Sequence, residues 1–218
     1  GLERDAYQST LMLDWELGSH SLAGLFGKSS NQWGAVTETY NRPDPGYFRL
    51  VYLPYDFTNS SAELRLTSPA DQRFEYMIGT NYYEESIFFG SRAFTNGVVS
   101  TLGAPTVYDA NTLGLFGSVS IDVSDALTVS AEARYQSDKI HHIVSGGSDL
   151  EDTFKSFSPR VIATYELSPD VNAYASVARG TRPGVFNSVF TALSAFAQAQ
   201  VLAQVSVPVA VQEETLLS

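Results

Sequence analysis

The sequence has no cysteine, only three histidines and no long apolar run. The absence of cysteine excludes disulfides and thiolate metal sites. With so few histidines, the sequence lacks candidate residues for a Ser-His-Asp triad or for a metal-dependent hydrolase site. His141 and His142 are neighbours, so on a strand they would face opposite ways and could not chelate one metal together. We therefore expect no enzyme activity, no cofactor and no metal site, and we expect both histidines to be solvated loop residues.

Positive charge is also scarce. Lys and Arg number 13 against 24 Asp and Glu, which gives a formal net charge of -11. A nucleic-acid partner would need a basic face, so that class of partner is excluded. No apolar run reaches the roughly 18 residues of a transmembrane helix. The chain is instead rich in Tyr (12), Phe (13) and Gly (16), which suits β structure.

Apolar and polar residues alternate over several long segments. The clearest segments are 126–138 and 157–167. In the first of them Leu127, Val129 and Ala131 share one face and Thr128 and Ser130 share the other. Strict alternation predicts strands with one apolar and one polar face. The same pattern predicts further strands at 7–17, 21–29, 61–67, 73–85, 112–123 and 171–177.

Turn signals divide these strands into hairpins. Short turns are predicted near 19, 70, 124 and 169, the last at Ser168-Pro169-Asp170, where Pro169 presets a turn dihedral. Long irregular stretches lie between them, at 31–55, 87–110, 139–152 and 181–210. Within the last stretch, 188–204 approaches helical spacing and predicts a helix or coil packed inside the loop.

This layout predicts the fold class. Short turns at one end and long loops at the other are typical of outer-membrane barrels, whose loops are extracellular. We predict an all-β fold, an antiparallel up-and-down transmembrane β-barrel segment of about eight to nine strands. A soluble β-sandwich that binds carbohydrate also alternates, and a passive porin-like barrel shares the strand pattern. The predicted strands are longer than the 5–6 residues usual in soluble proteins, which favours the membrane.

One stretch also resembles a known family. Residues 157–187, FSPRVIATYELSPDVNAYASVARGTRPGVFN, resemble the barrel region of TonB-dependent outer-membrane receptors. The family's G-x-[RK]-P-G-x-[FN]-N-like segment follows Arg179. The residues of this segment here are Gly180, Thr181, Arg182, Pro183, Gly184, Val185, Phe186 and Asn187. Val185 stands where a second glycine is usual in the family. Residues 125–135, DALTVSAEARY, resemble the family's DxLTxxxGxRY strand. The resemblance covers about residues 56–218.

The resemblance implies a receptor in the bacterial cell outer membrane that takes up a scarce nutrient, with the iron-siderophore class favoured. The implied partners are outer-membrane lipid, a small-molecule ligand and the TonB complex, which would act through a plug not present in this chain. We find no plug, no signal peptide and no terminal aromatic residue, and we therefore expect residues 1–218 to be a partial β-barrel domain truncated at both ends.

Two sets of residues are candidates for function. Aromatic and arginine side chains crowd the first two predicted loops, either as an interfacial girdle or as a ligand surface: Arg42, Tyr47, Arg49, Tyr52, Tyr83, Phe88 and Arg92. Charges on the polar strand faces are predicted to face the lumen, either as contacts for a plug or permeant or as mutually compensating ion pairs: Glu63, Arg65, Glu132, Arg134, Arg160 and Glu166.

Overall fold

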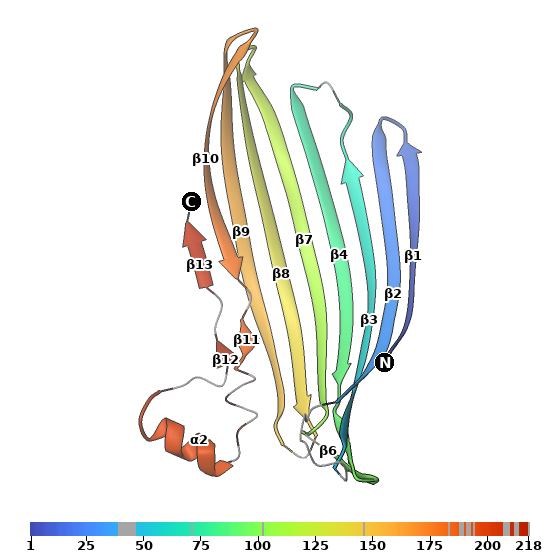
Figure 1. The fold of residues 1–218 in the computed structure, drawn as a ribbon. Coiled ribbons are helices and arrows are strands. Elements are labelled where there is room, and N and C mark those ends of the chain that lie inside the picture. Colours follow the sequence, from blue (N-terminus) through green and yellow to red (C-terminus); the bar gives the residue numbers. More distant parts are fainter. Residues whose placement is uncertain are drawn as a thin grey trace.

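A computed structural model describes residues 1–38, 47–70, 72–101, 103–145, 147–182, 184–187, 190, 193, 195–206, 210–211 and 214–217. Its main feature is one antiparallel sheet in the order β1-β2-β3-β4-β7-β8-β9-β10-β13, with the hairpin β5-β6 attached to β3 (Figure 1). The elements are β1 (Leu2–Leu17), β2 (His20–Glu38), β3 (Arg49–Thr67), β4 (Phe74–Phe89), β5 (Arg92–Thr95), β6 (Val98–Thr101), β7 (Thr106–Ser124), β8 (Leu127–Val144), β9 (Asp149–Ser168), β10 (Val171–Arg182), β11 (Val185–Phe186), α2 (Ala195–Leu202), β12 (Ala210–Val211) and β13 (Glu214–Leu217).

The predicted hairpins and short turns are confirmed. Consecutive long strands pair along most of their length, and all four short turns lie at the same end of the sheet (Figure 1). Gly18 adopts φ 67°, a left-handed conformation that favours glycine in the tight β1-β2 turn. At the β7-β8 turn the Ser124 hydroxyl accepts from the backbone N–H of Leu127 at 3.2 Å, as turn serines commonly do.

The strands are longer than predicted, and the predicted loops are correspondingly shorter. The stretch 139–152 is not a loop, because β8 continues to Val144 and β9 begins at Asp149. His141 and His142 are therefore strand residues, contrary to expectation. Likewise β2 runs to Glu38 and β3 begins at Arg49, while the centre of the predicted first loop, 39–46, lies outside the described residues.

Regular structure also appears inside the predicted loop 87–110. Strands β5 and β6 form a small hairpin around Asn96 and Gly97, which both have positive φ. Asn-Gly is the preferred pair for a two-residue hairpin turn. In the last loop, α2 lies within 188–204, where helical spacing was predicted.

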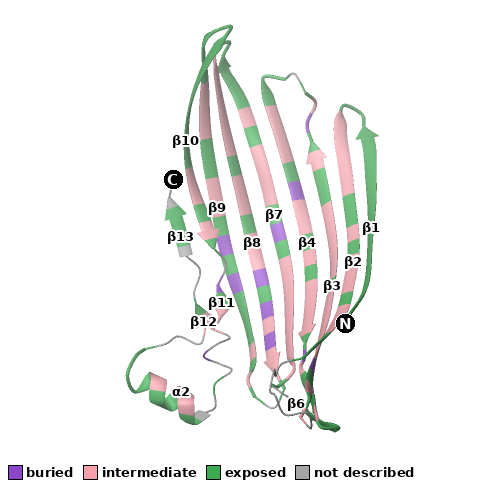
Figure 2. Ribbon diagram, in the orientation of Figure 1, coloured by how far each residue is buried: buried purple, intermediate pink, exposed green. Residues whose placement is uncertain are grey.

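The sheet has little core. Most of its large apolar side chains are exposed, for example Trp15 at 66% and Ile78 at 60% of full exposure. Buried positions are concentrated near the long-loop ends of β8 and β9 (Figure 2). The other sheet among the described residues is the short pair β11-β12, which is too small to form the second layer of a soluble sandwich. No helix among the described residues is long and apolar enough to cross a membrane.

The two faces of the sheet differ in composition. On the apolar face, a row of register partners crosses seven strands without a charged residue: Trp15, Leu22, Leu66, Ile78, Gly117, Ala133 and Pro159. Toward the long loops the same face becomes polar, in the row Ser9, Lys28, Ser60, Glu84, Asn111, Lys139 and Thr153. We call the first region the apolar band and the second the polar belt. The opposite face, which carries the predicted lumen charges, is called the polar face.

Candidate functional site

The polar face gathers the predicted charges. Register links Glu63 through Asn81 and Gly114 to Gln136, and it links Arg65 through Gly79 and Phe116 to Arg134. Glu132 lies directly opposite Arg160. The alternation of each strand places Glu166 on this face as well, nearer the short turns. All six residues therefore share one face, although they do not form one cluster.

The first groove on this face lies over β7, β8, β9 and β10. It has a volume of about 540 Å³, and its lining includes Phe116, Glu132, Arg134, Ser158, Arg160 and Arg179. The Arg160 guanidinium lies 3.8 Å from the Glu132 carboxylate. The Arg134 guanidinium lies 5.8 Å from the centre of the Phe116 ring, within reach of a cation–π contact. The groove thus holds three cations and one carboxylate.

Arg179 reaches this groove because the strand pairing changes beside it. The continuous ladder between β9 and β10 ends at Ala178 and Arg160. Beyond it, the Thr181 hydroxyl lies 3.0 Å from that of Ser158, a polar-face residue. Thr181 therefore turns to the polar face, and Arg179, two residues earlier, turns with it. Its guanidinium also donates to the Thr215 hydroxyl at 3.4 Å.

A second groove adjoins the first at Arg134. Its volume is about 430 Å³, and its polar lining includes Glu63, Asn81, Tyr83, Thr112, Arg134 and Gln136. Gly114 makes room for it, because a Cβ there would collide with the Asn81 amide and the Arg134 guanidinium. The Tyr83 hydroxyl donates to Glu85 at 2.6 Å.

A chain of hydrogen bonds fixes the side chains between these grooves and the long loops. Arg134 Nε donates to Gln136 Oε1 at 2.9 Å, and Gln136 Nε2 donates to the Asp138 carboxylate at 2.9 and 3.0 Å. The Thr112 hydroxyl donates to the same carboxylate at 2.6 Å. Asp138 was not among the predicted site residues. It continues the polar alternation of Arg134 and Gln136, so extending that pattern would have found it.

The family-motif residues close over the long-loop end of the polar face. The Phe186 ring meets the Phe154 ring edge-on, with centroids 6.2 Å apart. Gly184 packs so closely on Phe154 that a Cβ would collide with the ring. The Asn187 side-chain oxygen accepts from the Phe190 N–H at 3.2 Å, and Phe190 is buried. Gly180 and Arg182 lie at the end of β10, and Pro183 lies outside the described residues.

The predicted ligand residues do not form a single cluster. Tyr52 and Arg92 are cross-strand partners, and the alternation of β3 and β4 places Tyr52 and Phe88 on the same side as the polar belt. Arg49 and Tyr83 lie on the polar-face side, and Tyr47 precedes β3. Arg42 lies outside the described residues. Their role in ligand binding stays a prediction.

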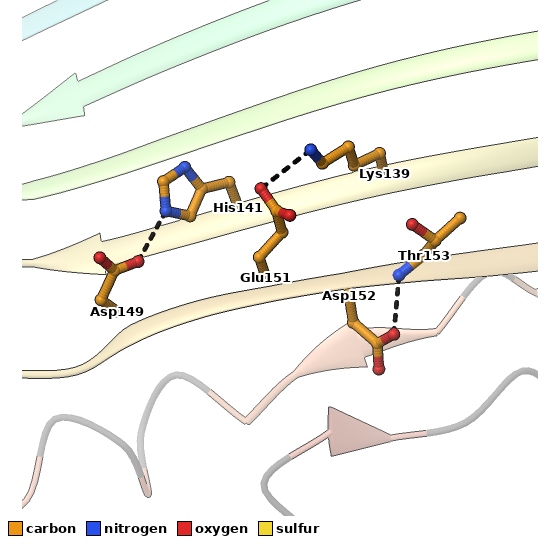
Figure 3. Close-up of polar contacts among 6 residues, drawn as sticks. All are labelled: Lys139, His141, Asp149, Glu151, Asp152 and Thr153. Atoms are coloured by element: carbon orange, nitrogen blue, oxygen red, sulfur yellow. Dashed lines mark hydrogen bonds and ion pairs between the residues drawn. The ribbon is translucent and has the colours of Figure 1, made fainter.

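The polar belt carries its own polar side-chain contacts, one ion pair and one hydrogen bond to a histidine. Lys139 Nζ lies 3.0 Å from Glu151 Oε2, and His141 Nε2 lies 2.7 Å from Asp149 Oδ1 (Figure 3). These pairs join β8 to β9 in the part that was predicted to be a loop. Across the described part of the chain, no group of three or more His, Cys, Asp or Glu residues could hold a metal ion.

Comparison with known proteins agrees with this architecture. A family model described as "TonB dependent receptor-like, beta-barrel" matches residues 2–208. The pesticin receptor of Yersinia enterocolitica is 24% identical over 160 residues, which are 70% of this chain and 24% of that protein. The chain therefore spans about a quarter of the length of the curated relatives it matches.

Solved structures show the same fold. The ferric yersiniabactin uptake receptor of Yersinia pestis matches with a TM-score of 0.69 and 16% identity, over 85% of this chain and 29% of that one. The ferric-catecholate import receptor of E. coli K12, in its open form, matches with a TM-score of 0.64 and 10% identity, over 84% and 36%. The chain belongs to the TonB-dependent receptor β-barrel family, whose members are outer-membrane proteins.

Proposed function

We propose that this chain forms part of the barrel wall of a receptor that imports a scarce nutrient across the outer membrane, with a ferric siderophore as the favoured ligand. The match of the family model to residues 2–208 carries the proposal. The names of the solved relatives, which handle ferric yersiniabactin and ferric catecholates, support the choice of ligand class.

In this proposal the polar face lines the lumen and the long loops face the outside of the cell. The two grooves offer alternating donors and acceptors, namely Arg134, Arg160 and Arg179 beside Glu132 and Asn81. Such a surface can hold a polar plug without burying unpaired charge. The TonB complex would supply energy through that plug. The wall residues bind and orient, and no bond is made or broken.

The long-loop end is the proposed ligand surface. Arg42 and Arg49, with Tyr47 beside them in sequence, are the residues that would meet an anionic ferric complex. Arg92, Tyr52 and Phe88 lie on the polar-belt side and would contact the ligand only as a second, separate surface. Arginine and aromatic side chains commonly dominate binding energy at such surfaces. Tyr83 lies in the second groove, where it would meet the ligand only after entry.

Uptake of radioactive iron by whole cells tests this proposal. Iron-starved cells with the gene deleted should lose uptake of the matching ferric siderophore, and cells without TonB should lose it equally. Arg49→Ala should reduce ligand binding by about tenfold, whereas Lys139→Ala, at the same end but on the polar belt, should leave it unchanged. A passive porin would instead admit small hydrophilic solutes without TonB, and that result would refute the proposal.

A further inference from the structure

The first groove on the polar face differs in charge from the rest of the chain. The whole sequence has a formal net charge of -11. Among the described lining of this groove, however, the charged residues are three arginines and one glutamate: Arg134, Arg160, Arg179 and Glu132. They come from β8, β9 and β10. The groove therefore holds a surplus of two positive charges in an otherwise acidic protein.

The arginines of this groove keep N–H donors that the described wall does not satisfy. An arginine carries five such donors. The 3.8 Å between Arg160 and Glu132 is too long for a hydrogen bond. Arg179 donates to Thr215 at 3.4 Å, and its Nε is buried without a hydrogen-bond partner among the described residues. Buried donors normally have a partner, so we expect an acceptor from outside the sheet to enter the groove.

Neighbouring contacts hold the Arg134 guanidinium in place. Its Nε donates to Gln136 at 2.9 Å, and Gln136 donates in turn to Asp138. Its other side lies against the Phe116 ring, at 5.8 Å from the ring centre. A guanidinium that is already oriented loses little side-chain entropy when it binds a ligand. This part of the groove is therefore preorganised for an anion.

The lining also indicates which kind of anion fits. Guanidinium groups recognise carboxylates and phosphates through paired N–H donors. Apolar side chains line the same groove, at Met77, Phe116, Pro159 and Ala178. Its volume of about 540 Å³ lies within the range of about 300–1,000 Å³ typical of small-molecule sites. An organic carboxylate offers oxygens to the arginines and a carbon skeleton to the apolar lining, so it matches the groove better than an inorganic anion.

We propose that the first groove is a binding site for a small organic carboxylate that carries more than one negative charge. Arg160 and Arg179 bind its carboxylate groups, and Arg134 with Phe116 contacts its skeleton. For the receptor this step rests on the proposed function: the groove is an inner site, which the imported nutrient meets after it leaves the long loops. The nutrient then carries free carboxylate groups.

Calorimetric titration of the purified full-length receptor with citrate, a small tricarboxylate, tests the site. Citrate should bind, and Arg160→Gln and Arg179→Gln should each weaken its affinity about tenfold through the loss of one charge-assisted contact. Trimethyl citrate, which has the same skeleton without the charges, should not bind. Arg73→Gln is the matched control, because Arg73 lies outside the groove and donates to the backbone carbonyls of Asp122 and Val123.

A variant with the opposite expected sign separates binding from a structural role. Glu132→Gln removes the carboxylate that repels an anion in the groove, and it should strengthen citrate binding several-fold. A loss of wall structure would weaken binding instead. Glu132→Gln that binds citrate less tightly than the wild type would therefore contradict the proposal.

A carboxylate could also come from the receptor itself, as an acidic side chain of the plug. A photo-cross-linking amino acid in place of Ser118, a lining residue, distinguishes this source. We expect its cross-links to stay within the barrel wall and to fall when citrate is present. Cross-links to a segment outside this barrel, unchanged by citrate, would show that the receptor's own chain fills the groove, and the proposal would be wrong.

The outcomes for the site and for the proposed function are separate. Wild-type receptor that does not bind citrate would overturn the site, as would Arg160→Gln and Arg179→Gln variants that bind it as tightly as Arg73→Gln does. If the site alone is wrong, TonB-dependent uptake of iron continues in cells whose receptor does not bind citrate. If the proposed function alone is wrong, citrate binds the purified receptor while uptake is absent.

Discussion

At the scale of single residues, Asp138 is a buried carboxylate that needs hydrogen-bond partners to offset its loss of solvent. It is 6% exposed and accepts from Thr112 and Gln136. Asp138→Ala removes the acceptor and leaves both donors unsatisfied, which should cost about 1–3 kcal/mol of unfolding free energy. Urea unfolding of the receptor in phospholipid vesicles would measure the loss. Asp152→Ala is the control, because Asp152 is exposed and accepts from the neighbouring Thr153 N–H; equal losses would contradict the role given to Asp138.

His142 is also a residue-scale feature, and it lies beyond the apolar band. Burial lowers its pKa below the usual value of 6.5. The folded chain therefore favours the neutral imidazole ring. The contribution of this neutral ring to the free energy of unfolding is complete above about pH 6.5 and is lost as the pH falls through the lowered pKa.

This linkage predicts local loosening in acid. The protection factors of the β8 amides near His142, which are corrected for the intrinsic pH dependence of hydrogen exchange, should fall between pH 7.5 and pH 5. His142→Phe cannot be protonated and should abolish this fall, whereas His141→Gln should keep it, since His141 lies on the opposite side of the strand. An unchanged pH response in His142→Phe would show that another group is responsible.

At the scale of elements, the packing of β11 against β9 requires a glycine at position 184. A Cβ at Gly184 would collide with the Phe154 ring and lie 2.7 Å from the Val211 carbonyl oxygen. Gly184→Ala should displace β11 from β9, at a cost of about 1–3 kcal/mol from overpacking, and should make residues 187–206 more sensitive to protease added to whole cells. Gly180→Ala serves as the control, because a Cβ there meets nothing within 4 Å. Equal protease sensitivity in the two variants would argue against the Gly184–Phe154 contact.

The elements also show what the sequence could and could not predict. The turns at Gly18 and Pro169 were predictable because turn chemistry is local. The ends of β8 and β9 were not, because the pattern changes face there: the charged Lys139 lies on the face that is apolar further along β8, and the buried Ile140 lies on the other, although the backbone ladder continues from Lys139 to Ile143. The candidate site shows the same limit. The alternation of each strand predicted that Glu132 and Arg160 lie on the polar face. The irregular pairing that turns Arg179 to that face leaves no mark in the sequence.

At the scale of the whole molecule, the apolar band indicates where the barrel crosses the membrane. On β9 the apolar positions run from Phe157 to Leu167. At about 3.3 Å per residue this is about 33 Å along the strand. A tilt of about 40° reduces it to about 25 Å, the height of the apolar band in outer-membrane barrels. The polar belt, which includes the Lys139–Glu151 pair, therefore lies outside the hydrocarbon.

Arginine substitutions on the apolar face locate that boundary directly. Val161 lies within the band, between Ala131 and Val177, so Val161→Arg should cost about 2–4 kcal/mol in phospholipid vesicles. Ser86 lies on the same face in the polar belt, opposite Asp109, and Ser86→Arg should cost at most about 1 kcal/mol, because a charge near the interface keeps its hydration. Urea unfolding of both variants in vesicles gives the difference, which should disappear in detergent micelles, where the apolar layer adapts to the protein. Equal costs in vesicles would place both positions in the same environment, and the boundary between band and belt would then not be the membrane surface.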